Sequence, residues 1–473
     1  MTKHTAFLFM VVIASSAVAR DFSLIKLRLA TAVGGKCLDG TPAGFYFRPG
    51  VNKSLFVISL EGGAYCSTEG SCNVRADTNL GSSLSWPDQP TKQTLDKNIL
   101  LNEECDRNPD FCDATTVYVP HCTADLHIGT RTEASEETWG YMFDGYHNYV
   151  AIIELLISNC GLEDATDVLL TGVSTGGVAV YHNLDYLADR LPSAVVKGAP
   201  IAGWYLPGPH PTDPPNIYTC SDYQHFASGT SGNTIGHPFE TNLWGSYENL
   251  PQDCIADFGE IPCTTVHNLY KYMKSSVFVV QAQYDPKHVY DSGGAPSDKP
   301  YMNSTDLEYF EFVGEATRES FEQIINSDAY AMKPHPDGIF SASCSHHNVP
   351  RAPMFIDGLE WTLLFNDWFF QKNEYESDHQ SVETCPYESG ELKLPCNALE
   401  TCRLDVGVPS PSSSPTPSIS NPIVTCIYGL EEKGCTSPWQ TEQMCLQCAS
   451  ANRPFLGNKG CTVTIVKGIC NEL

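Results

Sequence analysis

The chain has 473 residues and a formal net charge of −28, from 56 acidic and 28 basic side chains. Phosphate backbones and anionic bilayer surfaces are bound through Lys and Arg, so this charge argues against nucleic acid and acidic membranes as partners. We interpret the acidity as a feature that keeps the protein in solution.

The N-terminus, residues 1–19, has the organisation of a secretory signal peptide. Lys3 and His4 precede an apolar run, and Ala17-Val18-Ala19 matches an A-x-A cleavage site. The apolar run is too short to span a bilayer, and no later stretch of about 20 apolar residues follows it. We therefore predict a secreted protein without membrane insertion, in a compartment where its 20 cysteines form disulfides. The even count predicts full pairing, and two N-x-S/T sites, Asn52 and Asn303, are predicted to carry glycans.

Short apolar runs alternate with helical patterns along the first 280 residues. The runs expected to be strands are residues 55–60, 115–119, 167–171 and 276–280, and the helical patterns are residues 138–158 and 178–190. Continuous apolar runs of this length are typical of strands covered on both faces. Their alternation with helices predicts an α/β fold with a mostly parallel sheet, flanked by helices as in the α/β-hydrolases. Ligands of such folds gather where the strands end.

A nucleophile motif lies between the third strand and the helix after it. Gly172-Val173-Ser174-Thr175-Gly176-Gly177 contains G-x-S-x-G, and the context of strand, motif and helix is that of a nucleophile elbow. A plain glycine-rich turn with an incidental serine is the alternative. Serine needs a base to act as a nucleophile, and the base is usually a histidine held by a carboxylate.

The chain offers both partners in the order expected of an α/β-hydrolase. Asp285 follows the fourth strand, and His346 and His347 lie in a later loop. A metal site at the two adjacent histidines is disfavoured, because neighbouring side chains seldom point at one ion. We predict no metal and no cofactor.

An oxyanion hole requires backbone N–H groups directed at one point. Small residues follow the first strand in Glu61-Gly62-Gly63-Ala64. We predict that the N–H groups of Gly63, Ala64 and Thr175 form the hole, although a tight turn would also explain the two glycines.

A change of composition divides the chain near its C-terminus. Residues 408–422 are rich in Pro and Ser and have no apolar periodicity, which predicts an extended linker between a catalytic domain at 20–407 and a module at 423–473. Six cysteines in so short a module indicate three disulfides. Cys445-x-x-Cys448 alone does not predict zinc, since a zinc ribbon needs a second such pair.

Five blocks in sequence order resemble the family of pectin acetylesterases and Notum, which are extracellular carboxylic-ester hydrolases. They are Leu60–Cys66, Pro120–Asp125 with Gly129, Gly172–Gly177, Ala282–Asp285 and Ser343–His347. The resemblance implies an α/β-hydrolase-like fold with a triad of Ser174, Asp285 and His347, and the spacing from Cys344 selects His347 over His346. Two departures concern the pocket: Ala64-Tyr65 replaces a Gly-Trp or Trp-Tyr pair, and residues 199–204 lack the family's acidic residue.

The predicted function is that of a secreted serine carboxylesterase that removes O-acetyl groups from an extracellular polysaccharide such as pectin of the cell wall. One alternative is deacylation of a lipidated protein, as in Notum. A second alternative is a non-catalytic polysaccharide-binding protein on a hydrolase scaffold, which the intact triad disfavours. The triad alone would also suit a serine peptidase.

Overall fold

The structure is a computed structural model. It describes residues 21–27, 35–95, 98–206, 242–247, 249–285, 287, 304–325, 333, 335–344, 346–347, 354–372, 374 and 379–383. The predicted signal peptide, the linker, the C-terminal module and Asn303 lie outside the described residues. Asn52 begins a strand with an exposed side chain, and its glycosylation stays a prediction.

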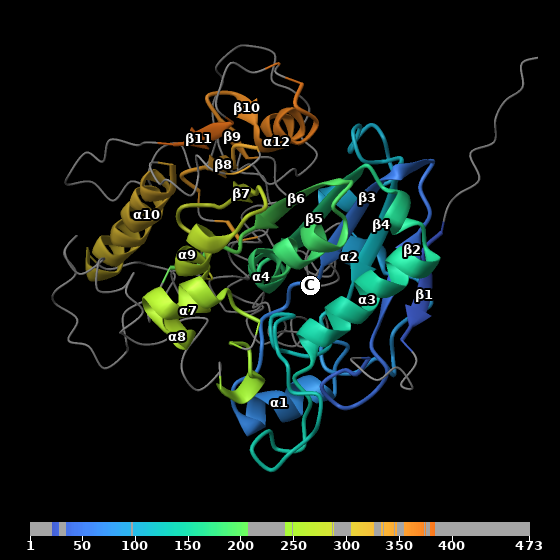
Figure 1. Cartoon of the computed structure of the whole chain (residues 1–473). Helices are drawn as coiled ribbons and strands as arrows, with labels where there is room; N and C mark the ends of the chain where they lie inside the picture. The colour runs from blue at the N-terminus through green and yellow to red at the C-terminus, as the bar shows by residue number, and fades with distance from the viewer. Residues whose placement is uncertain are drawn as a thin grey trace, which may run out of the picture.

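A nine-stranded sheet with the order β1-β2-β4-β3-β5-β6-β7-β8-β11 runs through the protein (Figure 1). The pairs β1–β2 and β2–β4 are antiparallel, and every other neighbouring pair is parallel. A separate two-stranded sheet pairs β9 with β10. The strands are β1 (Ser23–Lys26), β2 (Gly44–Arg48), β3 (Asn52–Leu60), β4 (Ala114–Val119), β5 (Asp167–Val173), β6 (Val195–Ile201), β7 (Phe278–Val280), β8 (Gly338–Ser341), β9 (Phe355–Ile356), β10 (Leu359–Glu360) and β11 (Gln380–Val382).

Helices cover both faces of the large sheet and fill the connections between its strands (Figure 1). The α-helices are α1 (Glu69–Ala76), α2 (Lys92–Leu95), α3 (Gly145–Asn159), α4 (Thr175–Arg190), α7 (Gln252–Phe258), α8 (Glu260–Cys263), α9 (Val266–Leu269), α10 (Ser304–Ile325) and α12 (Trp361–Phe370). The described residues also form the 3₁₀ turns η1 (Ile99–Leu101), η2 (Leu162–Asp164) and η3 (Tyr270–Tyr272). None of the helices in the described part of the chain combines the length and apolar character that crossing a bilayer requires.

In the described residues, two hydrophobic cores, one on each face of the sheet, explain the continuous apolar runs of the central strands. In β3, Phe56 and Ile58 pack into the core formed with α3 and α4. Leu55 and Val57, which point to the opposite face, pack into the core formed with α12. The predicted α/β fold with a mostly parallel sheet is therefore confirmed.

The expected helix over residues 138–158 is wrong at its start. In the structure α3 begins at Gly145, and Trp139 and Gly140 have positive φ angles of 54° and 83°. A right-handed helix cannot include such residues, so the segment before α3 folds as turns. The apolar periodicity came from its C-terminal half alone.

Four disulfides join described cysteines: Cys37–Cys122, Cys66–Cys72, Cys105–Cys112 and Cys254–Cys263. Cys344 is also disulfide-bonded. Cys160, at the end of α3, has a free thiol, so the expectation of full pairing is wrong at this position. An even count of cysteines permits complete pairing but does not require it.

Lys197 is a buried cation that binds the last turn of α12. It lies on β6 with no exposed surface, and its Nζ donates to the carbonyls of Trp368 at 3.0 Å and Phe369 at 2.9 Å. Burial lowers the pKa of Lys197 to about 8. The ammonium satisfies two carbonyls that the helix α12 leaves without an internal donor.

Lys197→Met is expected to lower the free energy of unfolding by about 2–4 kcal/mol, because two buried carbonyls lose their donor. Urea unfolding followed by circular dichroism measures this change. Lys372→Met is the matched control, since Lys372 forms a partly exposed ion pair with Asp110 at 2.7 Å. Such a pair contributes at most about 1 kcal/mol. Equal effects of the two substitutions would contradict the proposed role of Lys197.

Candidate active site

Ser174 occupies a strained turn between β5 and α4. Its φ of 61° and ψ of −123° lie in a region that residues with a side chain rarely adopt. The surrounding glycines are needed for close backbone contacts: a Cβ on Gly172 would lie 2.3 Å from the Gly176 carbonyl oxygen, and one on Gly176 would lie 2.1 Å from that of Leu60. The sequence thus folds locally as an elbow that presents a half-buried serine at the end of a central strand.

The start of α4 leaves backbone donors next to this serine. The N–H of Ser174 donates to the carbonyl of Ile201 on β6 at 2.9 Å, which fixes the turn. Thr175 is the first residue of α4. The first N–H groups of a helix have no acceptor within the helix, so the Thr175 N–H is available to a ligand beside Ser174.

Asp285 and His347 are in contact after the ends of neighbouring strands. The Nδ1 of His347 lies 2.9 Å from Oδ1 and 2.8 Å from Oδ2 of Asp285. The chain segments stay side by side beyond β7 and β8, since the Gln283 N–H donates to the Ala342 carbonyl at 2.9 Å. Asp285 is fully buried, while the side chain of His347 is 14% exposed. This geometry lets the carboxylate fix the ring and its tautomer, with Nε2 left for a second partner.

Gln281 is a polar contact of Asp285 that the sequence did not reveal. Its Oε1 accepts the backbone N–H of Trp204 at 3.0 Å, so its Nε2 must face the other way, where it donates to Asp285 Oδ2 at 3.3 Å. The Lys287 N–H donates to Asp285 Oδ1 at 2.8 Å. Asp285 therefore receives three donors. Gln281 also connects it to the segment after β6, where the family's acidic residue is missing.

The loop after β3 passes directly beside Ser174. A Cβ on Gly62 would lie 3.1 Å from the Ser174 Cβ and 2.2 Å from the Val173 carbonyl oxygen, so only glycine permits this approach. Gly63 and Ala64 follow with positive φ angles of 132° and 58°. The three residues predicted to form an oxyanion hole, Gly63, Ala64 and Thr175, therefore lie on the two segments that flank Ser174.

Glu61 anchors this loop to the segment after β4. Its Oε2 accepts the His121 N–H at 3.0 Å, and its carbonyl binds Nε2 of His127 at 2.9 Å. A carbonyl only accepts, so His127 carries its proton on Nε2. Burial lowers the pKa of His127 to about 4, which keeps the ring neutral. Sequence patterns gave no sign of this support, because its members meet only in the folded chain.

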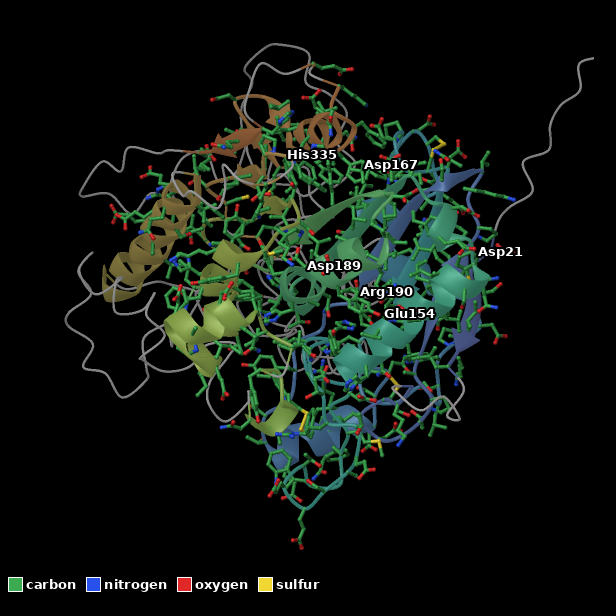
Figure 2. The ribbon with its side chains drawn as sticks, in the orientation of Figure 1. Asp21, Glu154, Asp167, Asp189, Arg190 and His335 are labelled. Carbon is green, nitrogen blue, oxygen red and sulfur yellow. A yellow bond between two sulfur atoms is a disulfide. The ribbon has the colours of Figure 1, made fainter. Side chains whose placement is uncertain are left out.

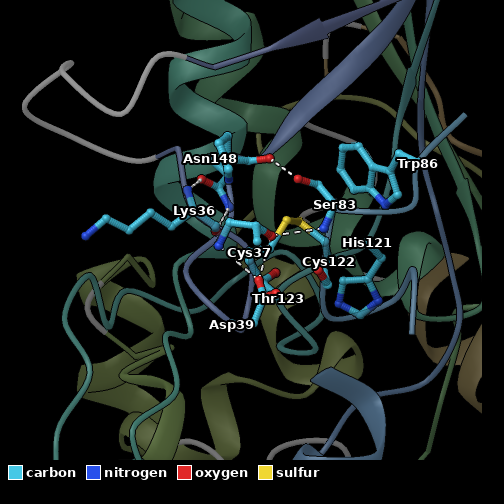
Figure 3. The surroundings of a disulfide bond; sticks show 12 residues. Lys36, Cys37, Asp39, Ser83, Trp86, His121, Cys122, Thr123 and Asn148 are labelled. Carbon is cyan, nitrogen blue, oxygen red and sulfur yellow. Dashed lines mark hydrogen bonds between the residues drawn. A yellow bond between two sulfur atoms is a disulfide. The ribbon is translucent and has the colours of Figure 1, made fainter. Parts of the chain in front are cut away.

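The same segment is fixed by a disulfide and by α3. Figure 3 shows the Cys37–Cys122 bond with His121 and Thr123 beside it. Asn148 on α3 binds both backbone groups of Lys36, accepting from its N–H at 3.0 Å and donating to its carbonyl at 2.7 Å. The segment after β4 is therefore linked to α3 through Cys37 and its neighbour Lys36.

Comparison with known proteins identifies the family. The profile described as pectinacetylesterase matches residues 15–392. The chain belongs to the pectinacetylesterase family. The resemblance drawn from the five sequence blocks is thus confirmed, and membership supports the assignment as a carboxylic-ester hydrolase.

The chain is similar both to a pectin acetylesterase and to Notum proteins. Pectin acetylesterase 5 from Arabidopsis thaliana is 30% identical over 400 residues, which cover 79% of this chain and 84% of that protein. Palmitoleoyl-protein carboxylesterase notum1' from Xenopus laevis is 29% identical over 311 residues, covering 63% of this chain. The chain spans only 59% of the length of that relative. The crystal structure of the Wnt deacylase Notum from Drosophila superposes with a TM-score of 0.61 at 24% identity, covering 77% of this chain and 97% of that one, which supports the fold.

Proposed function

We propose that the protein is a serine carboxylesterase that removes O-acetyl groups from an extracellular polysaccharide such as pectin. The observation that carries the proposal is the strained Ser174 at the end of β5, together with the Asp285–His347 pair at the same edge of the sheet. A strained nucleophile, a base with a fixed tautomer and unoccupied backbone donors are the parts that acyl transfer requires.

In the first half-reaction, Ser174 Oγ attacks the ester carbonyl carbon while Nε2 of His347 takes the hydroxyl proton. Asp285 holds the ring and stabilises its charged form. The N–H groups of Gly63, Ala64 and Thr175 bind the oxyanion of the tetrahedral intermediate. When the intermediate collapses, the C–O bond to the sugar breaks, and the sugar oxygen leaves with the proton from His347.

In the second half-reaction, water replaces the sugar. His347 takes a proton from the water, whose oxygen attacks the acetyl-serine carbonyl. Collapse of the second intermediate returns the proton to Ser174 Oγ and releases acetic acid. The cycle needs only groups of this chain, its ester substrate and water.

We favour an acetyl ester over a long-chain ester as the substrate, because this protein aligns over more of the pectin acetylesterase than of the Notum relative. It covers 84% of pectin acetylesterase 5 but 59% of the Notum relative. Deacylation of a lipidated protein is the second candidate, because Notum has the same fold.

Hydrolysis of p-nitrophenyl esters from acetyl to palmitoyl is expected to be fastest with acetyl. An acyl pocket built for two carbons should lower kcat/KM by about tenfold or more for octanoyl and longer chains. Acetate release from acetylated pectin, compared with release from chemically deacetylated pectin as the blank, tests the polymer directly. A maximum at medium or long chains, with no acetate released, would favour the lipid-ester candidate. Hydrolysis of no ester would favour a non-catalytic binding protein.

We further propose the arrangement around this domain. A signal peptide at 1–19 would direct the chain to the secretory pathway, and glycans would be attached at Asn52 and Asn303. The linker at 408–422 and the module at 423–473 would hold the domain at 20–407 near its polymer. The support is the order of these segments in the sequence.

A further inference from the structure

Arg75 binds the back of the loop that passes beside Ser174. Its Nη2 donates to the carbonyl of Ala64 at 2.9 Å and also to the carbonyl of Gly63. No sequence motif pointed to this arginine. It lies in the last turn of α1, 11 residues after Ala64.

These contacts determine where the N–H groups of the loop point. A trans peptide is planar, and its C=O and N–H point in opposite directions. The Gly63 carbonyl shares a peptide with the Ala64 N–H, and the Ala64 carbonyl shares one with the Tyr65 N–H. Because Arg75 holds both carbonyls on one side of the loop, both N–H groups are turned to the other side.

Of these two groups, the Ala64 N–H belongs to the proposed oxyanion hole. Within the described residues, no group accepts a hydrogen bond from the N–H of Gly63 or Ala64. Both residues have positive φ, which is unfavourable for Ala64 because of its Cβ. An external restraint is therefore required to hold this conformation before substrate arrives, and the guanidinium provides it.

Arg75 is itself held in place by local covalent and hydrogen-bonded restraints. The Cys66–Cys72 disulfide joins the loop to α1, and a capping box between Thr68 and Ser71 begins the helix. The side chain of Leu80 contacts Gly63 from the segment after α1, at 3.0 Å from the position of an added Cβ. Loop and helix thus form one unit in which the guanidinium has little freedom.

The charge of Arg75 adds to its geometric effect. Burial lowers its pKa to about 10, while Glu61 and Asp125 oppose the shift, so it remains a cation at neutral pH. A cation bound to a peptide carbonyl draws electrons from that peptide and makes its N–H a stronger donor. The hydrogen bond from the Ala64 N–H to the substrate oxygen is therefore strengthened most when that oxygen becomes negatively charged.

We propose that Arg75 is the positioning residue of the oxyanion hole: it fixes and polarises the peptide that supplies the Ala64 N–H, without touching substrate. This inference rests on the proposed esterase function. It assigns to Arg75 a contribution made in the transition state, when the oxygen becomes charged, and little contribution to ground-state binding.

Arg75→Ala is expected to lower kcat for p-nitrophenyl acetate by about 10²-fold, with KM changed less than about threefold. Arg75→Lys should lower kcat by about tenfold, because an ammonium keeps the charge but is more strongly hydrated and lacks the planar guanidinium that holds Nη2 against both carbonyls. The affinity of a trifluoromethyl ketone, which forms a charged adduct with Ser174, should fall in parallel with kcat/KM. Inhibition by acetate should not change.

Rescue of kcat by added guanidinium ion distinguishes the proposed role of Arg75 from a merely structural one. At millimolar concentrations, well below those that denature proteins, the ion should raise kcat of Arg75→Ala in a saturable manner and leave the wild-type enzyme unaffected. Arg190→Ala is the matched control: Arg190 pairs with Glu154 between α4 and α3 on the surface (Figure 2). Its kcat should equal that of the wild type.

The outcomes separate this inference from the proposed function. Ser174-dependent hydrolysis with an unchanged kcat in folded Arg75→Ala would overturn the role of Arg75 and leave the esterase assignment intact. A rise in KM alone would overturn it as well. Hydrolysis that does not depend on Ser174 would overturn the proposed function, and with it the inference. If Arg75→Ala does not fold, Arg75→Lys decides: wild-type kcat in that variant contradicts the need for a planar guanidinium.

Discussion

Ser174→Ala is expected to lower kcat for p-nitrophenyl acetate by about 10⁴–10⁶-fold, because no acyl-enzyme can form without the hydroxyl. The backbone donors and His347 remain, so a small rate above that of water should persist. Initial rates with purified protein, checked with a fluorophosphonate that labels active serines, measure both effects. The label should appear on the wild-type enzyme and be absent from the variant.

The matched control is Ser158→Ala, which removes an exposed hydroxyl from α3. It should keep wild-type kcat. Ser174→Gly is a second informative variant: it should be inactive yet more stable than Ser174→Ala by about 1 kcal/mol, since glycine adopts a φ of 61° without strain. Wild-type turnover in Ser174→Ala would show that the nucleophile is another residue.

Local parts of this site could be predicted from the sequence because their geometry is encoded by neighbours in the chain. The elbow at Ser174 is a strand, a glycine-rich turn and a helix within about 25 consecutive residues, and each piece has its own pattern. Asp285 lies shortly after the apolar strand β7, in the segment that continues it. In these cases, the position along the chain determines the position in space.

The supporting contacts could not be predicted in this way. Gln281 reaches Trp204, 77 residues earlier, and Lys197 reaches α12 from more than 170 residues away. Arg75 is closer in sequence to its partners, but arginines in short helices are common and give no signal. Which side chains meet in such contacts follows from strand order and helix packing, neither of which has a sequence period.

The edges of the fold show the same limit. The antiparallel strands β1 and β2 border a sheet whose remaining strands are parallel, and their short runs resemble many loops. The segment before α3 shares the composition of the helix but contains Gly140 in a left-handed conformation. Positive φ angles at Trp139 and Gly140 make the helix begin later than the apolar pattern indicated.

Asp285→Asn is expected to lower kcat by about 10⁴-fold with a small change in KM, because the carboxylate determines the tautomer of His347. Three donors converge on Asp285: His347 Nδ1, Gln281 Nε2 and the Lys287 N–H. An amide offers one acceptor oxygen, so its NH₂ group must face a donor. The clash between the NH₂ group and Nδ1–H disappears if the proton of His347 is on Nε2, because Nδ1 then accepts from the amide. In that tautomer Nε2 cannot accept the proton of Ser174.

Asp367→Asn is the control that separates this effect from the loss of a buried Asp–His contact in general. Asp367 is almost fully buried and lies 2.7 Å from Nε2 of His379, at the end of α12 and on the face of the sheet opposite to α4. Its replacement should lower the melting temperature but leave kcat of the folded protein within about threefold of wild type, as expected of a contact that makes no transition-state interaction. If both variants lose stability and neither loses kcat, then Asp285 holds the fold and a different carboxylate orients His347.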